Sequence, residues 1–504
     1  MTPGSAETAI PLVAQWVADG TGGVIVQGDP ARQFANVSID TRTLTPGDLF
    51  IAIRGDRFDG SEFAGAAIAA GAGGVVVPRG WAARSGRPWS ATRVKQEAIR
   101  TEQETIRAEQ APPLREGGAI ESVVIEVDDT TTALQRLGRA VRRASGTKVV
   151  AITGSAGKTT TKEVTSEFLA ARYRVIRNRG NLNNHIGLPL SLIELRQRPE
   201  IAVVELGMNH AGEISTLTRL AEPDVRVWTN VGEAHLGFFA SLDAIADAKA
   251  EILEGAAAST VLVANADDER ITARTGGFAG RTVTFGVEHD ADVRARDVID
   301  RGIEGVEARV TTAKGEIDLR SPLIGRGNLS NVLAAAAVAL ECDVPLDVIR
   351  DRAAHLKPAA HRGEVVRLRD HVTVIDDSYN ANPTATRRAL EVLAGSSAGR
   401  RVAVLGEMLE LGARAVDLHE EVGRAAATAP VDLLFAVGGT PAAALAGAAI
   451  ASGMSADSVR HYATSDAAAD AVAAVVQPGD LVLVKGSRGI RTDRVVDRLK
   501  AERT

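Results

Sequence analysis

The chain has 504 residues, more than one hydrophobic core usually holds, so its length predicts several domains. Hydrophobic residues make up 45% of the chain and charged residues 24%, as is typical of soluble globular proteins. The net charge of −6 argues against a general electrostatic attraction to nucleic acid. The only cysteine, Cys342, excludes an internal disulfide and a zinc cluster built from cysteines.

The ends and apolar runs of the sequence predict a cytoplasmic enzyme. The first 20 residues lack a basic region followed by an apolar core, so no signal peptide is expected. No apolar run approaches the roughly 20 residues that a membrane-spanning helix needs. We therefore expect no membrane insertion. Nothing in the sequence indicates an oligomer, and a monomer is the default expectation.

Residues 1–127 contain short strand-like segments, namely "VSIDTR", "GDLFIAI", "GGVVVP" and "SVVIEV", with the helical segment "EFAGAAIAAGA" between them. They predict a small α/β domain at the N-terminus. Within it, residues 84–118 are rich in Arg, Glu, Gln and Pro and have almost no large apolar side chains. Such a segment has little to bury, so we interpret it as an exposed insertion.

Residues 128–359 alternate between apolar strand-like runs and helical stretches, which predicts a central domain with a parallel sheet. Between residues 281 and 324 the pattern alternates as in strands and indicates a small antiparallel addition. Residues 360–504 again alternate strands and helices and predict a Rossmann-like, doubly wound domain. The predicted fold is thus α/β in three domains.

The stretch "VVAITGSAGKTTTKE", residues 149–163, has the context of a phosphate-binding loop: a short strand, a glycine-rich turn and a helix. It departs from the Walker A pattern, because Ile152 stands where the first glycine belongs. Backbone N–H groups at such a turn bind phosphate oxygens. Lys158 would reach the terminal phosphates, and the Thr159 hydroxyl would bind Mg²⁺. The alternative is an ordinary glycine-rich turn with a fortuitous lysine.

Acidic and histidine candidates follow the next predicted strands. Glu205 ends one strand, Asn230 and His235 come just after the next, and Lys249 lies on a following helix. Side chains at the carboxyl ends of neighbouring parallel strands meet at one edge of the sheet, where Mg²⁺ ligands are expected. Taken singly, Glu205 could be a helix-capping acid and His235 a buried core histidine. Their shared position favours the functional interpretation.

Further polar segments predict substrate contacts. Residues 177–192, "RNRGNLNNHIGLPLSL", carry three asparagines that would suit either a turn or recognition of a polar substrate. In the third domain, "VIDDSYNANPTA" (374–385), "VLGEMLELG" (404–412) and "VKGSRG" (484–489) each end a predicted strand with polar or glycine-rich turns. Several polar strand ends on one sheet edge indicate a binding crevice.

These motifs resemble those of the Mur ligases and their folylpolyglutamate synthetase relatives, in which the shorter phosphate loop "TGSAGKTT" is the usual form. The resemblance covers nearly the whole chain except 84–118. It is carried by "GNLNNHIGLPLSL", "ELGMNHAGEI", "GRGNLSNVLAAAA", "DDSYNANPTA", "VLGEMLELG" and "VKGSRG". Within the family, they point to the branch that joins D-alanyl-D-alanine to a UDP-N-acetylmuramoyl-tripeptide.

The resemblance implies the activity and the cofactors. ATP and Mg²⁺ would activate the tripeptide carboxylate as an acyl phosphate, which the dipeptide amine attacks in peptidoglycan precursor synthesis. The process serves cell-wall formation, cell shape and cell division. The N-terminal domain would bind the UDP moiety, and the central domain would bind ATP.

The resemblance also implies residue roles. Catalytic roles would fall to Lys158, His235 and Lys249, with Lys249 carrying a CO₂-derived carbamate. The metal ligands would be Thr159, Glu205, His235 and the modified Lys249. Residues implied to contact ATP are Gly154, Ser155, Ala156, Gly157, Lys158, Thr159, Thr160, Asn328, Arg362 and Asp377. Residues implied to contact the UDP-sugar peptide are Thr41, Arg42, Asn181, Asn183 and Asn184.

Some positions depart from the family pattern. Gly327 and Ser61 stand where many relatives carry histidine, and the pair His361-Arg362 is more like other Mur ligases. Two alternatives stay open from the sequence: another ligase of the superfamily with a different amino acid, and an ATPase without ligase activity. Whether the third peptide residue is lysine or diaminopimelate cannot be read from the sequence.

Overall fold

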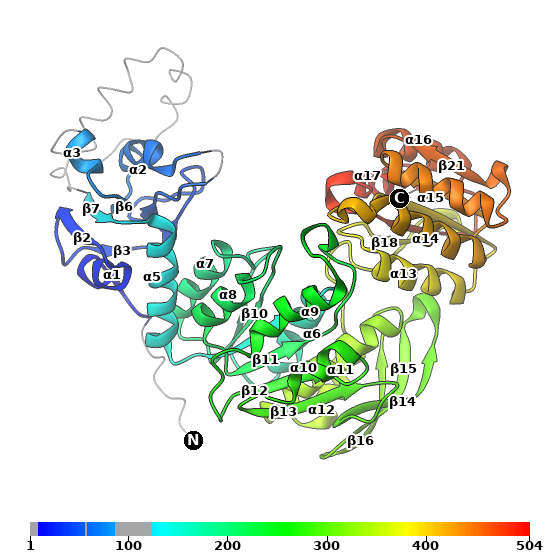
Figure 1. Cartoon of the computed structure of the whole chain (residues 1–504), viewed down its shortest axis with the longest axis horizontal. Helices are drawn as coiled ribbons and strands as arrows, with labels where there is room; N and C mark the ends of the chain where they lie inside the picture. The colour runs from blue at the N-terminus through cyan, green and yellow to red at the C-terminus, as the bar shows by residue number, and fades with distance from the viewer. Residues whose placement is uncertain (1–8, 56–57, 86–121, 504) are drawn as a thin grey trace, which may run out of the picture. The chain divides into compact units, whose positions relative to one another are not determined.

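The structure is a computed structural model that describes residues 9–55, 58–85 and 122–503 (Figure 1). The predicted insertion at 84–118 lies outside the described residues, except for its first two. The chain forms two compact units, which are described separately. The first comprises residues 1–148, 178–202 and 219–222, and the second comprises residues 149–177, 203–218 and 223–504. Within the described ranges, no helix is long and apolar enough to cross a membrane.

The first unit is built around a five-stranded sheet in the order β2-β7-β6-β5-β4. Strand β2 is antiparallel to β7, and the other pairs are parallel. A separate two-stranded sheet pairs β1 with β3. The strands are β1 (Leu12–Val13), β2 (Val24–Gln27), β3 (Gln33–Phe34), β4 (Val37–Ser38), β5 (Leu49–Ile51), β6 (Gly74–Pro78) and β7 (Val123–Val127).

Helix α5 (Thr130–Ser145) follows β7 and is strongly amphipathic. Its N-cap Asp129 accepts a hydrogen bond from the Thr132 N–H at 2.6 Å, and the helix ends at Gly146 with φ of 69°. Its buried leucines and valine face other apolar side chains, and α5 packs against α1 and α7. The helices of this unit are α1 (Ala14–Thr21), α2 (Ala64–Ala69), α3 (Trp81–Ser85), α5 and α7 (Gly187–Ile193).

The phosphate loop belongs to a nine-stranded sheet in the order β16-β15-β14-β13-β12-β11-β8-β10-β9. Strand β8 is paired in parallel with β11, and β11 with β12. The strands are β8 (Lys148–Thr153), β9 (Val175–Arg177), β10 (Ile201–Glu205), β11 (Val225–Trp228), β12 (Val261–Asn265), β13 (Arg281–Gly286), β14 (Val293–Asp300), β15 (Val306–Thr312) and β16 (Gly315–Ser321).

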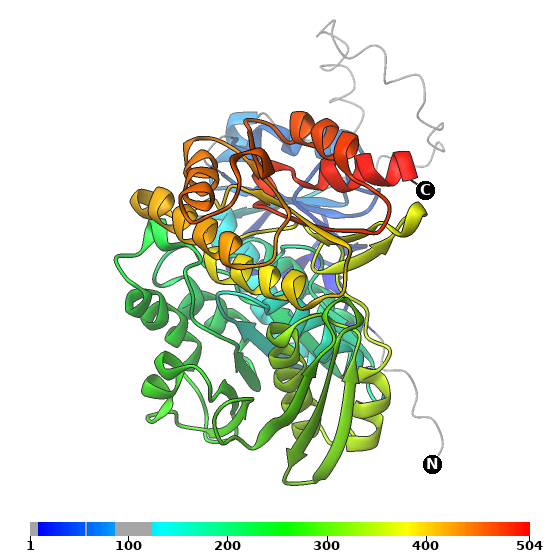
Figure 2. The same ribbon diagram turned by 90° about the vertical axis from the view of Figure 1, so that its right-hand side faces the viewer.

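Strands β14 to β16 form the antiparallel end of this sheet, visible as green strands at the lower edge of Figure 2. The predicted antiparallel addition between residues 281 and 324 is thus present, although β13 still pairs in parallel with β12. Helices α6 and α11 pack against each other, as do α9 and α10. The helices are α6 (Lys158–Leu169), α8 (Glu213–Ala221), α9 (Leu242–Ala250), α10 (Glu269–Thr275), α11 (Arg326–Glu341) and α12 (Leu346–Ala353).

The C-terminal part contains a six-stranded sheet in the order β17-β18-β22-β19-β20-β21. Strand β17 is antiparallel to β18, and the remaining pairs are parallel. Its strands are β17 (Glu364–Arg367), β18 (Thr373–Asp377), β19 (Arg400–Gly406), β20 (Leu433–Val437), β21 (Val459–Tyr462) and β22 (Asp480–Lys485). Its helices are α13 (Pro383–Gly395), α14 (Ala415–Thr428), α15 (Thr440–Ala451), α16 (Ser465–Val475) and α17 (Asp493–Arg503).

The predicted α/β fold class is confirmed, because each of the three large sheets is mostly parallel and is connected through helices. The exact domain boundaries stay a prediction. Near them, β7 ends at Val127 and α5 begins at Thr130, whereas α12 ends at Ala353 and β17 begins at Glu364.

Candidate active site

The phosphate loop follows β8, an inner strand of the sheet, and enters α6 at Lys158. Gly154 has φ of 151° and Gly157 has φ of 80°, values that side chains rarely allow. A Cβ at Gly154 would lie 1.9 Å from Thr229 Oγ1, and one at Gly157 would lie 2.2 Å from Asn331 Oδ1. Both glycines are therefore required by backbone conformation and by space.

Residues that follow β11 hold the loop in place. Asn230 accepts from the Ala156 N–H at 2.9 Å and donates to the Ala156 carbonyl at 2.9 Å. The Ser155 hydroxyl accepts from the Gly232 N–H at 2.8 Å. Asn230, expected at the sheet edge, thus organises the loop. Loops fixed in this way present their N–H groups to a phosphate without further ordering.

Lys158 and Thr159 lie where the sequence predicts. The Lys158 amine donates to the Gly154 carbonyl at 2.8 Å, which curls the side chain back over the loop. Burial lowers the pKa of Lys158, Glu205 and Glu410 oppose this change, and Arg362 adds to it. The Thr159 hydroxyl donates to Glu205 Oε2 at 2.8 Å. The loop lysine, the hydroxyl and the carboxylate therefore form one cluster.

Lys249 is almost completely buried, with 1% of its surface exposed. Burial, and secondarily the charge of Lys158, set the pKa of Lys249 well below its ordinary value. Among the described residues, its amine has neither a hydrogen-bond nor an ion-pair partner. Burial away from water and the charge of a second lysine both disfavour the charged form of this amine.

His235 meets a residue that is far away in the sequence. Its Nδ1 lies 2.7 Å from Glu410 Oε2, and this contact lowers the pKa of Glu410. Both residues have a positive φ, 62° and 64°. Non-glycine residues adopt such values rarely, and strained backbone tends to gather at functional sites. Beneath the pair, Gly237 donates its N–H to the Glu410 carbonyl at 2.8 Å.

Arg362 and Asp377, the predicted nucleotide contacts of the C-terminal part, have different surroundings. The Arg362 guanidinium lies over the Tyr379 ring at 4.1 Å and interacts electrostatically with Lys158. Asp377 pairs with the buried amine of Lys485 at 2.6 Å. Of the two, only Arg362 lies near enough to the phosphate loop to lower the pKa of Lys158, and the nucleotide contacts of both residues stay predictions.

Asn328 is connected to the loop through a neighbour on α11. It accepts a hydrogen bond from Asn331 at 3.1 Å, and Asn331 accepts one from the Thr161 hydroxyl at 3.2 Å. Asn328 itself donates to the Ile324 carbonyl at 2.9 Å. Gly327 leaves room for Arg388, because a Cβ at this position would meet the Arg388 side chain at 3.3 Å.

The predicted substrate residues belong to the first unit. Arg42 is exposed and forms a bidentate pair with Asp40, and this contact lowers the pKa of Asp40 to about 2. Asn184 accepts from the Gly187 N–H at 2.8 Å and so stabilises the start of α7. Thr41, Asn181 and Asn183 lie in the same unit. Contact of these residues with a substrate stays a prediction.

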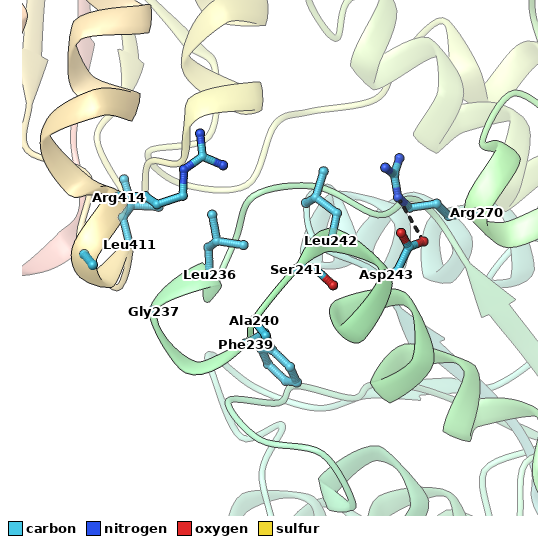
Figure 3. Close-up of a pocket in the computed structure, with 11 residues that line it drawn as sticks. Leu236, Gly237, Phe239, Ala240, Ser241, Leu242, Asp243, Arg270, Leu411 and Arg414 are labelled. Atoms are coloured by element: carbon cyan, nitrogen blue, oxygen red, sulfur yellow. Dashed lines mark ion pairs between the residues drawn. The ribbon is translucent and has the colours of Figure 1, made fainter.

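A pocket of about 500 Å³ is lined in part by Leu236, which follows His235 in the sequence, and by Leu411, which follows Glu410. Figure 3 shows Arg414 and Arg270 on opposite sides of it, with Leu236 and Leu242 between them. Arg270 pairs with Asp243 at 3.5 Å, and Arg414 with Glu421 at 3.7 Å. Because both arginines already have carboxylate partners, we assign no ligand to this pocket.

The donor atoms of the cluster fit Mg²⁺. The Thr159 hydroxyl and the Glu205 carboxylate converge at 2.8 Å, and Mg²⁺ prefers oxygen ligands. In the part of the chain that the structure describes, no three His, Cys, Asp or Glu side chains are arranged to hold a metal ion. In nucleotide enzymes Mg²⁺ needs only one or two protein ligands, because phosphate and water oxygens complete its coordination shell.

Replacing Gly157 by alanine should destabilise the protein by about 2 kcal/mol, because the new methyl group strains a positive φ and meets Asn331. It should also abolish ADP binding, since the loop must shift. Thermal unfolding and titration calorimetry measure the two effects. Gly146→Ala is the control: its φ is 69° but nothing lies within 4 Å of the added Cβ. Equal losses in both variants would contradict the steric argument.

Several site residues were not assigned roles from the sequence. Glu410 lies within "VLGEMLELG", which was singled out only as a polar strand end, and its partner His235 is 175 positions away. Asn331 gave no signal beyond being a polar residue in an alanine-rich helix. Glu233, which bonds Thr384 at 2.9 Å and Arg387 at 2.8 Å, was also missed.

The fold and this cluster define a class of protein: a nucleotide-binding enzyme whose phosphate loop follows an inner strand of a mostly parallel sheet. Three family profiles match the chain. They are the Mur ligase family catalytic domain over residues 33–142, the Mur ligase middle domain over 152–339, and the glutamate ligase domain of Mur ligases over 361–488. The chain belongs to the Mur ligase family.

Individual relatives are similar over nearly their full length. The UDP-N-acetylmuramoyl-tripeptide–D-alanyl-D-alanine ligase of Bacillus subtilis is 34% identical, covering 92% of each chain. The crystal structure of MurF from Acinetobacter baumannii has a TM-score of 0.82 at 30% identity, covering 98% of this chain and 99% of that one. MurF from Thermotoga maritima in complex with ADP has a TM-score of 0.76 at 26% identity, covering 93% and 97%.

The predicted membership in the Mur ligase family, with its similarity to MurF, is confirmed. The three-domain α/β architecture is that of its structural neighbours. Members of the family are ATP-dependent ligases that form C–N bonds, and this chain is one of them.

Proposed function

We propose that this enzyme joins D-alanyl-D-alanine to UDP-N-acetylmuramoyl-tripeptide in peptidoglycan precursor synthesis. The observation that carries the proposal is the cluster of Lys158, Thr159 and Glu205 at the phosphate loop, in a chain similar to MurF ligases over nearly its whole length. We place the reaction in the cytoplasm, where ATP and UDP-sugars are made, and take the enzyme to act as a monomer.

The proposed reaction has two steps. A carboxylate is a poor acyl donor, so an oxygen of the tripeptide carboxylate first takes the γ-phosphoryl group of ATP, and ADP is released. The dipeptide amine then attacks the carbonyl carbon of this acyl phosphate. The tetrahedral intermediate expels inorganic phosphate, and the nitrogen loses a proton as the amide forms. Phosphate is a good leaving group, which is what the first step supplies.

The residues of this chain bind and orient the reactants. Residues 154–160 hold the ATP phosphates with backbone N–H groups, and Lys158 neutralises the charge that develops on the transferred group. Arg362, which already acts electrostatically on Lys158, contacts the same phosphates. Asn328 contacts the adenine and Asp377 the nucleotide. Substrate contacts fall to Thr41 and Arg42 for the UDP moiety and to Asn181, Asn183 and Asn184 for the peptide.

Mg²⁺, when bound, supplies a positive charge that polarises phosphoryl oxygens. Thr159 and Glu205 would hold one ion, and His235 a second. We also propose that Lys249 is carbamylated. A buried neutral amine without a partner is suited to react with CO₂, and the product is an anionic oxygen ligand. The carbamate would attract a metal ion, whereas a lysine ammonium would repel it.

The function is tested by measuring phosphate release from ATP and Mg²⁺ with UDP-N-acetylmuramoyl-tripeptide, in the presence and absence of D-alanyl-D-alanine. We expect release that requires both substrates and a product with the mass of the UDP-sugar pentapeptide. Release that needs a different amino acid would move the protein elsewhere in the superfamily. Release without either substrate would support an ATPase.

A further inference from the structure

The loop that follows β19, residues 407–412, contains strained backbone. Glu410 has φ of 64°, and Gly412 has φ of 59°. A residue other than glycine keeps such a conformation only where its surroundings fix it. Glu410 is also the residue whose carboxylate lies 2.7 Å from Nδ1 of His235. Whatever fixes this loop therefore also fixes the carboxylate beside His235.

Hydrogen bonds to backbone atoms anchor residues 408–410. The Leu409 N–H donates to the Ser487 hydroxyl at 2.9 Å, and the Glu410 carbonyl accepts from the Gly237 N–H at 2.8 Å. The Met408 N–H donates to Nε2 of His419 at 2.8 Å. Met408 is only 2% exposed, so water cannot readily replace the imidazole as the acceptor of its N–H. Of these acceptors, the imidazole is the one that titrates near neutral pH.

The hydrogen bonds of His419 define its tautomer. The side chain lies on α14 and is completely buried, with 0% of its surface exposed. Its Nδ1 lies 2.6 Å from the Ala415 carbonyl, one helical turn earlier, and a carbonyl can only accept. Nδ1 therefore carries the proton, and Nε2 is free to accept from the Met408 N–H. The other neutral tautomer would satisfy neither contact.

Protonation of His419 would break the contact with the loop. A proton on Nε2 would place one N–H against another, and the buried Met408 N–H would lose its acceptor. Burial lowers the pKa of His419, whereas the Ala415 carbonyl and the charge of Glu407 oppose this change. The net direction is downward, so the neutral form is favoured at neutral pH and is lost only in acid.

The charged groups around His419 come from the loop and from the helices beside it. They are Glu407 and Glu410 in the loop, Arg414 in the turn before α14, Arg387, Arg388 and Glu391 on α13, and Asp417, Glu420, Glu421 and Arg424 on α14 itself. Helix α15, which packs against α14, has no titratable side chain. Among the described residues, Glu407 is the charged group that acts on the pKa of His419.

We propose that His419 is a positioning residue of the ligation reaction: in its neutral form it anchors the 407–412 loop and keeps the Glu410 carboxylate beside His235, and its protonation releases the loop. His419 is buried, so it acts through the loop and not on a reactant. Its effect on the rate rests on the proposed function, whereas the anchoring of the loop is a property of the fold. The enzyme thus contains an acid-sensitive support for its active site.

Two amide substitutions separate the acceptor from the imidazole. A glutamine oxygen can take the place of Nε2 and does not titrate, whereas an asparagine amide is too short to reach the Met408 N–H. Near neutral pH, His419→Gln should form pentapeptide within about threefold of the wild-type rate, and His419→Asn should be slower by about tenfold or more, because it leaves a buried N–H unpaired. His461→Gln replaces an exposed histidine of the same sheet and is the matched control, which should keep the wild-type rate.

The pH dependence is measured as the ratio of the wild-type rate to the His419→Gln rate, because the ionisation of the substrates cancels in this ratio. The ratio should be constant at neutral pH and should fall below pH 6.5, the ordinary pKa of histidine, since burial lowers the pKa of His419. Hydrogen–deuterium exchange of residues 404–412 gives the same comparison without substrates. In acid, this segment should exchange faster in the wild type than in His419→Gln at the same pH.

The inference is overturned if the rate ratio stays constant into acid, if His419→Gln is as slow as His419→Asn, or if the exchange of the loop is the same in wild type and His419→Gln. Thermal unfolding at neutral pH checks that the variants are folded. Should His419→Asn not fold, the comparison of wild type with His419→Gln decides alone. Failure of the proposed function is distinct: a wild type that forms no pentapeptide, yet shows the acid-dependent exchange, would refute the function and support the anchoring.

Discussion

Lys158→Ala is expected to lower the rate of ligation about a thousandfold or more while leaving the protein folded. The Lys158 amine lies over the loop, 2.8 Å from the Gly154 carbonyl, where it can contact the terminal phosphates of a bound triphosphate. Removing the amine loses one hydrogen bond, which contributes only about 1 kcal/mol to stability. It also removes a positive charge that disfavours the charged form of Lys249. Pentapeptide formation measures the first effect and thermal unfolding the second.

Lys148→Ala is the control for this prediction. Lys148 starts the same strand, β8, at the end opposite to the phosphate loop. It should retain near-normal activity. Lys158→Arg keeps a positive charge with a different shape, and it tests whether charge alone suffices. Normal turnover by a folded Lys158→Ala protein would refute the role of the loop lysine.

Lys249→Ala is expected to reduce activity about a hundredfold or more, and a small added carboxylate such as acetate should restore part of it. The alanine variant leaves a cavity where the carbamate would be, and acetate can place a carboxylate oxygen there. The measurement is the ligation rate as a function of acetate concentration. A fully active Lys249→Ala protein would eliminate the carbamate proposal.

Lys249→Met separates the missing oxygen ligand from a packing defect. Methionine fills the space and carries no charge, so this variant should be inactive and should not respond to acetate. Because the buried amine is costly, Lys249→Met should be at least as stable as the wild type in the absence of bicarbonate. Isotope-labelled bicarbonate should give a carbamate NMR signal with the wild type and none with this variant. A signal that persists in Lys249→Met would place the carbamate elsewhere.

Much of the fold could be predicted from the sequence because its signals are local. Apolar runs such as "KVVAIT" and "DLVLVKGS" are buried strands, and the glycines and polar residues after them mark the carboxyl ends of the sheets. The phosphate loop is local in the same sense, since Gly154 to Thr159 are contiguous. The short strand β9 was not predicted, because its three residues are too few to show the alternation of buried and exposed side chains that is typical of a strand, and Arg177 is exposed.

The long-range pairs of the site were beyond prediction from one sequence. Nothing around His235 indicates Glu410, because the two residues lie in loops that follow strands of different sheets. The same holds for Tyr379 and Arg488, which are 109 positions apart in the sequence and meet because β18 and β22 are neighbours in the sheet. Sequence patterns place residues at a sheet edge, whereas strand order decides which of them touch.

The backbone contact beneath His235 and Glu410 limits how this pair can be varied. A Cβ at Gly237 would lie 2.8 Å from the Gly412 nitrogen, and one at Gly412 would lie 2.7 Å from the Gly237 Cα. The two loops are already as close as peptide backbones can pack. Substitution at either glycine can only increase the separation of the histidine from the carboxylate. The backbone contact therefore limits how closely the two loops can approach, and even an alanine at either glycine would push them apart.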